Sequence, residues 1–206
     1  MEQHTSYQYR KKRVRARDIV LLALLTAMVV LASIICAITV PIHLGTALVV
    51  IIGATFGWKT GGFVGAMSML LNNFYLGQGI WTPFQMLAMG LVGVISGLCF
   101  SNDSKFYQLW NIRLTEKKRC IALGIFTVFL IIIVYGGIMN FQTFLYSTWM
   151  MGTTEGISGK GLLAFYITGI PYDISHGLAA SVCVILLEAP FAKKIERIHL
   201  KYGFYR

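Results

Sequence analysis

The most reactive residue types in this chain meet in one short segment, GIPYDISHG, at positions 169–177. Asp173 and His176 are three residues apart, so a helix would place both side chains on one face. Ser175 and His176 are neighbours and would project about 100° apart on that helix, which argues against a serine hydrolase triad. Two roles remain for Asp173. It binds a ligand or His176, or, if Pro171 is the first helical residue, it complements the positive end of the helix dipole.

A second segment, NNFYLGQGIWTPFQ at positions 72–85, combines four amides with aromatic side chains. An aromatic belt at a membrane interface would account for Tyr75 and Trp81 alone, but a belt does not need four amides. Amides above an apolar cavity give neutral hydrogen-bond recognition of a small organic molecule. His43 either reaches the same site or is an interfacial residue. We therefore predict a substrate site made of His43, Asn72, Asn73, Tyr75, Gln78, Trp81, Gln85, Tyr172, Asp173 and His176.

Other kinds of chemistry lack their sequence signals. The four cysteines lie in or at the ends of apolar segments with no CxxC pair, which favours buried free thiols over a disulfide framework or a metal site. The chain has no HExxH or GxSxG motif and no Walker sequence. The sequence therefore predicts no metal, no cofactor and no enzymatic activity.

Long apolar segments must position these residues, since 56% of the chain is hydrophobic. A helix needs about 20 mostly apolar residues to cross a bilayer. The segment Gly45–Tyr75, broken at Trp58–Thr60, reads as two short helices joined by a cytoplasmic turn, or as a re-entrant hairpin. We predict an all-α integral membrane protein, a six-helix transmembrane bundle. Its four other helices are predicted at Ile19–Val40, Pro83–Phe100, Cys120–Phe141 and Pro171–Ala189.

The positions of the basic residues predict the orientation. Seventeen of the 18 Lys and Arg residues fall at 10–17, 59, 105–119 and 193–206, and only Lys160 falls elsewhere. Cytoplasmic loops retain Lys and Arg, so both termini should be cytoplasmic. The net charge of +10 then reflects topology and attraction to anionic lipid rather than nucleic-acid binding.

This topology divides the chain into a membrane domain at 19–190 and two basic cytoplasmic tails at 1–18 and 191–206. It also predicts three outward segments, Val40–Leu44, Asn72–Thr82 and Gln142–Ile170.

Small residues spaced by four indicate places where helices approach closely. Ala23 and Ala27 form one such pair on the first predicted helix. Gly53, Gly57, Gly61 and Gly65 span the predicted cytoplasmic turn and therefore form two packing pairs. Gly93 and Gly97 make a further close-approach site.

The chain resembles the substrate-binding S components of energy-coupling factor (ECF) vitamin transporters over nearly its whole length, from Arg17 to Ala192. The resemblance rests on the Ala23-xxx-Ala27 motif, on NNFYLGQGIWTPFQM and on GIPYDISHG. It implies that Ala23 and Ala27 face a transmembrane coupling subunit, while the outward loops bind a vitamin. It also implies that the S component topples within the membrane, driven by two ATPase subunits. The subgroup it is most similar to includes cobalamin-specific members.

Residues and resemblance together predict an S component in a prokaryotic plasma membrane. Its partners would be a vitamin, the coupling subunit, two ATPases and membrane lipid, without nucleic acid. Cobalamin or a related cofactor precursor is the first substrate hypothesis, because corrin edges carry many amides. A flat heterocyclic vitamin could use the same residues in a tighter pocket. The alternative function is a membrane-embedded enzyme or assembly factor that uses Asp173 and His176.

Overall fold

The computed structural model describes residues 15–39, 43–101, 115–151 and 159–202, and every element among them is helical. Parts of several predicted segments lie outside these ranges. They are most of the N-terminal tail, the last residues of the C-terminal tail, positions 40–42 of the first outward segment, the linker at 102–114 and positions 152–158.

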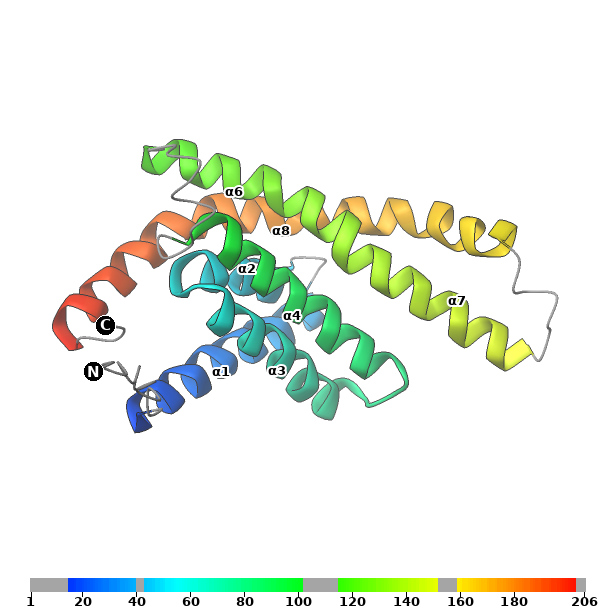
Figure 1. Cartoon of the computed structure of the whole chain (residues 1–206), viewed down its shortest axis with the longest axis horizontal. Helices are drawn as coiled ribbons and strands as arrows, with labels where there is room; N and C mark the ends of the chain where they lie inside the picture. The colour runs from blue at the N-terminus through cyan, green and yellow to red at the C-terminus, as the bar shows by residue number, and fades with distance from the viewer. Residues whose placement is uncertain (1–14, 40–42, 102–114, 152–158, 203–206) are drawn as a thin grey trace, which may run out of the picture.

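The described helices form six rods, which Figure 1 shows in chain order. Four of them are long and apolar enough to cross a membrane, and the short apolar α2 and the more polar α3 are not among these four. One rod changes from α-helix to π-helix and back between α6 and α7. The elements are α1 (Ala16–Thr39), α2 (Leu44–Phe56), α3 (Trp58–Leu76), α4 (Trp81–Phe100), α6 (Glu116–Leu130), the π-helix η1 (Ile131–Gly136), α7 (Gly137–Met151) and α8 (Gly159–Tyr202).

The short helix α2 forms the centre of the molecule. All ten residues from Gly45 to Ala54 are buried, and α2 contacts α1, α3, α4 and α8. A helix that is apolar on all sides is stable only when protein or lipid surrounds it. With 13 residues α2 is about 20 Å long, too short for a hydrocarbon core of about 30 Å. The surrounding helices therefore provide the apolar environment that the bilayer would otherwise supply.

Glycines allow three helices to touch at the backbone. A Cβ atom on Gly61 of α3 would lie 2.5 Å from the carbonyl oxygen of Gly93 on α4 and 2.6 Å from the Cα of Gly53 on α2. Real side chains do not fit at such distances, so each glycine is required by the packing. The predicted close approach at Gly53, Gly61, Gly65, Gly93 and Gly97 is thus confirmed, and Gly53, Gly61 and Gly93 meet at one three-helix junction. The Ala23–Ala27 pair stays a prediction.

The turn between α2 and α3 lies one residue earlier than predicted. Trp58, Lys59 and Thr60 already belong to α3, and the break is Gly57 alone, with φ of 89°. Glycine adopts this left-handed conformation without the steric cost that a Cβ atom would bring.

The predicted outward segment Gln142–Ile170 is wrong in its secondary structure. Helix α7 continues to Met151, and α8 begins at Gly159, well before Pro171. A prediction based on bilayer thickness ends each helix after about 20 residues, whereas these rods extend beyond α1–α4 at one end of the molecule (Figure 1). Pro171 lies inside α8. Membrane helices tolerate an internal proline when neighbouring groups compensate for the lost backbone hydrogen bond.

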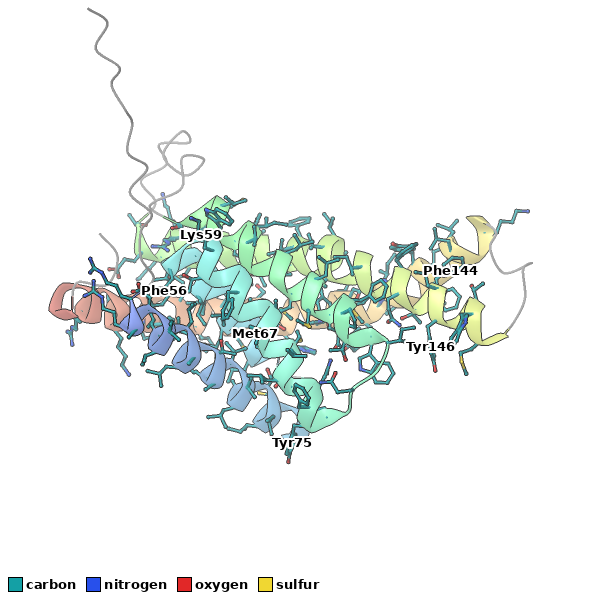
Figure 2. All side chains as sticks on the ribbon, turned by 60° about the horizontal axis from the view of Figure 1, so that its bottom comes forward. Phe56, Lys59, Met67, Tyr75, Phe144 and Tyr146 are labelled. Carbon is teal, nitrogen blue, oxygen red and sulfur yellow. The ribbon has the colours of Figure 1, made fainter. Side chains whose placement is uncertain are left out.

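Basic side chains gather at the opposite end, where α1 and α6 begin and α2 and α8 end. Arg119 of α6 forms an ion pair with Glu188 of α8 (Nε–Oε1, 3.2 Å) and donates to the Ala54 carbonyl of α2 at 3.3 Å. Lys193 pairs with Glu116 at 3.0 Å. Lys59 lies at this end of α3, and Tyr75 lies at its other end (Figure 2). The chain thus has a basic end and an end that is poor in charge.

Candidate functional site

Four ring side chains from three parts of the chain form a histidine cluster: His43, Tyr135, Tyr172 and His176. His43 immediately precedes α2, and its ring stacks on that of His176 with centroids 3.7 Å apart and planes at 29°. Tyr135 of η1 meets the His176 ring edge-on at 5.0 Å, and Tyr172 does so at 6.1 Å. His176 lies at the centre and is only 2% exposed.

The two ring nitrogens of His176 have different surroundings. Nε2 is hydrogen-bonded to the hydroxyl of Thr46 at 3.0 Å, which links α8 to the first turn of α2. Nδ1 is buried and has no hydrogen-bond partner among the described residues. Beside it, burial lowers the pKa of His43 below the usual value, so the His43 imidazole is neutral at pH 7. Thr46 therefore occupies one nitrogen of His176, and the other nitrogen is a buried polar atom among aromatic rings.

Asp173 lies next to this cluster but pairs with another residue. Its carboxylate is buried and accepts a hydrogen bond of 2.8 Å from the side-chain amide of Asn140 on α7. It also packs against the backbone of Gly136, where a Cβ atom would collide with it. Because α8 begins at Gly159, the interpretation of Asp173 as a helix-end charge is wrong. No hydrogen bond joins Asp173 to His176 within the described residues.

Three polar side chains form a second group, the amide cluster: Asn73, Thr82 and Gln85. The Asn73 amide donates to Thr82 Oγ1 at 3.0 Å and to Gln85 Oε1 at 2.7 Å. The same Thr82 oxygen accepts from the Gly79 backbone at 3.3 Å. These bonds join the end of α3 to the start of α4, so the amides satisfy one another and fix the α3–α4 hairpin.

The remaining predicted residues lie around the amide cluster. Asn72 is buried, and no described residue bonds to its Oδ1. Gln78 donates to the Leu70 carbonyl at 3.3 Å, and the Trp81 ring covers Gly79. Tyr75 is 68% exposed and points away from the helices (Figure 2). Among the described residues, no hydrogen bond or ring contact joins this region to the histidine cluster. The predicted residues thus fall into two groups.

Sequence reasoning missed Thr46, Tyr135 and Asn140. Tyr135 and Asn140 fall within a predicted apolar helix, and a polar side chain there was a usable signal, because such residues usually face the interior of the bundle. No motif or spacing in the sequence marked Thr46 as a candidate site residue. The described residues also hold no group of three or more His, Cys, Asp or Glu side chains arranged for a metal ion.

Spanning-length helices around a buried centre, with a neutral aromatic cluster between them, define a multi-pass membrane protein with a candidate site for a small molecule. The family model for the S component of the ECF-type riboflavin transporter matches residues 13–197, about nine-tenths of the chain, so the chain belongs to that family. A search of curated proteins found no match.

This membership confirms the predicted resemblance to ECF S components. The chain is a transport protein of the plasma membrane that serves vitamin uptake, and it is not an enzyme.

Proposed function

We propose that this chain captures a flat heterocyclic vitamin in the outer half of the membrane and delivers it together with a coupling subunit and two ATPases. The observation that carries this proposal is the histidine cluster, in which three rings surround the His176 imidazole and its buried Nδ1, to which no described residue bonds. Aromatic walls with a few placed polar atoms are typical of sites for small planar ligands. Tyr172, at 60% exposed, gives the cluster a side that a ligand can reach.

Riboflavin is the first substrate to test, because the matching family is described as riboflavin S components. Its fused rings carry carbonyl oxygens and ring nitrogens that suit the histidine cluster. Cobalamin, the substrate favoured by the amide-rich sequence, is the second. A corrin would need the amides of Asn73 and Gln85 to leave their mutual hydrogen bond, which makes the flat ring the better fit.

We propose that the basic end is cytoplasmic, together with the tails 1–18 and 191–206, so that the histidine and amide clusters belong to the outer half. The ion pairs and Lys59 at the basic end support this orientation through the preference of cytoplasmic ends for Lys and Arg. Single cysteines at Gly79 and Lys59 test it. The first should react with an impermeant thiol reagent on whole cells, and the second should react only after permeabilisation.

Helix α1 supplies the proposed contact with the coupling subunit. Ala23 and Ala27 are exposed on the face of α1 that points away from the protein core, whereas Leu25 and Val29 are buried on the opposite face. Small side chains on an exposed helix face allow another helix to approach closely.

Ligand binding to the purified chain tests the substrate proposal. Mass spectrometry of small molecules released from gently purified protein identifies a bound vitamin, and calorimetry then compares riboflavin with cyanocobalamin. Tyr172→Ala should weaken binding about tenfold or more through loss of ring contact. Tyr146→Ala, a matched change near the far end of α7, should have little effect. If neither vitamin binds and none copurifies, the proposal of vitamin capture fails for these substrates.

A further inference from the structure

Several polar groups at this end of the molecule are paired, whereas Nδ1 of His176 and Oδ1 of Asn72 have no hydrogen-bond partner among the described residues. Asp173 accepts from Asn140, Thr46 is bonded to Nε2 of the same imidazole, and Asn73 bonds to Gln85. His176 is 2% exposed, and its Nδ1 has no partner in the part of the chain that the structure describes. Buried polar atoms in native proteins almost always have a hydrogen-bond partner, so an orphaned one calls for a specific explanation.

The bond to Thr46 determines what Nδ1 can do. A neutral imidazole carries its proton on one nitrogen, and the hydrogen bond at the other nitrogen selects which one. When the Thr46 hydroxyl donates to Nε2, the proton resides on Nδ1 and that atom becomes a donor. Thr46 lies in the first turn of α2, and the hydroxyl donates to no other group within the described residues. This arrangement favours the Nδ1–H form.

Three rings restrict the approach to Nδ1. His43 stacks on one face of the imidazole, and Tyr135 and Tyr172 meet it with interplanar angles of 79° and 64°. A partner for Nδ1–H must therefore arrive close to the plane of the ring. A carbonyl oxygen or an unprotonated ring nitrogen at the rim of a flat heterocycle meets this requirement.

We propose that His176 orients the vitamin by donating a hydrogen bond from Nδ1 to an acceptor atom on the rim of the ligand, and that Thr46 is the positioning residue that keeps the proton on Nδ1. This inference rests on the proposed function and adds to it a specific atom, a direction of donation and a residue that the sequence did not single out. The chemical class it selects is a planar heterocycle with an acceptor at its edge.

Two pairs of variants test this role. The terminal atoms of Asn lie close to the position of Nδ1, and those of Gln lie close to that of Nε2, so His176→Asn should retain much more affinity for riboflavin than His176→Gln. The expected difference is about tenfold, the effect of one lost hydrogen bond. Thr46→Val removes the hydroxyl at constant shape and should weaken binding about tenfold, whereas Thr46→Ser should preserve it. Gel filtration and thermal unfolding confirm that each variant is folded.

Nitrogen NMR of histidine-labelled protein in nanodiscs supplies a readout that a merely structural role would not move. The wild type should show His176 protonated at Nδ1, and Thr46→Val should shift the proton toward a mixture of both forms. Equal losses of affinity in His176→Asn and His176→Gln would overturn the inference, and so would a wild type protonated at Nε2. A titration with riboflavin that leaves the Nδ1 resonance unchanged would also overturn it, because an ordered water would then be the partner of Nδ1. A wild type that binds neither riboflavin nor cyanocobalamin would instead contradict the proposed function, and the tautomer measurement would still decide the role of Thr46.

Discussion

Individual polar residues in this protein divide into those that pair with one another across helices and those of the histidine cluster, which meet mainly through ring contacts. The amides of Asn73 and Gln85 bond to each other, and Asn140 bonds to Asp173. His43 and His176 instead present ring surface to each other and leave nitrogen atoms for other use. Pairing of this kind is not visible in a sequence, because it depends on contacts between residues up to 130 positions apart.

The stacked histidines predict a pH dependence of stability. Burial lowers the pKa of His43 in the folded protein, whereas the unfolded chain has a value near 6.5. The contribution of neutral His43 to the free energy of unfolding is therefore complete above about pH 6.5. It is lost as the pH falls below about 6.5, because the unfolded chain binds the proton more tightly than the folded chain. Thermal unfolding between pH 8 and pH 5 should show a falling midpoint. His43→Gln should flatten this dependence, and an unchanged slope in that variant would assign the effect to other groups.

A buried ion pair gives the second prediction at this scale. Glu188 is almost fully buried, pairs with Arg119 and accepts from the Cys120 thiol at 2.9 Å. Removing one partner of a buried pair typically costs about 3–5 kcal/mol, since a charge remains without compensation. Glu188→Ala should lower stability by an amount of that order, measured by unfolding in detergent. The double variant Glu188→Leu with Arg119→Met should recover part of the loss, and full additivity of the two changes would refute the pairing.

At the scale of helices, close packing depends on glycine where α2, α3 and α4 meet. A Cβ atom on Gly93 would collide with the Gly61 carbonyl, which belongs to backbone and cannot rotate away. We expect Gly93→Ala to destabilise the protein by about 1–3 kcal/mol through overpacking. Gly137→Ala is the matched control, because a Cβ atom there meets nothing within 4 Å and alanine favours a helix. Equal thermal midpoints for both variants would show that the junction relaxes.

Hydropathy predicted most of the helices because four rods satisfy the length and composition that a bilayer demands. The break at Trp58–Thr60 predicted the α2–α3 hairpin, within one residue of the turn that the structure places at Gly57. It did not predict that α7 continues to Met151 or that α8 already begins at Gly159, because the rule of about 20 residues describes the hydrocarbon core and not helix length. The π-helix at Ile131–Gly136 was also unpredictable, although it carries Tyr135 and the glycine that contacts Asp173. Three-dimensional packing separates the predicted site residues into the histidine cluster and the amide cluster.

The whole molecule exposes one face of α1, which carries Ala23 and Ala27. Ala23→Trp or Ala27→Trp adds bulk on the exposed face of α1, away from His176. Uptake by cells and copurification with the coupling subunit should fall about tenfold or more, in line with an overpacking cost of about 1–3 kcal/mol, while vitamin affinity of the isolated chain stays unchanged. Leu178→Trp, exposed on α8, is a control for bulk alone. Loss of vitamin affinity with intact copurification would place α1 in the binding site instead.

The enclosure of α2 has a consequence for how the chain is made. A 13-residue helix with ten successive buried residues gains little from entering lipid alone, so it should wait beside the translocon until α3, α4 and finally α8 cover it. The chain would then become resistant to proteases only after α8 has been synthesised and has packed against α2. Chains released after Met151 should be degraded rapidly in pulse–chase experiments. Equal lifetimes for truncated and full-length chains would mean that the earlier helices already form a finished unit.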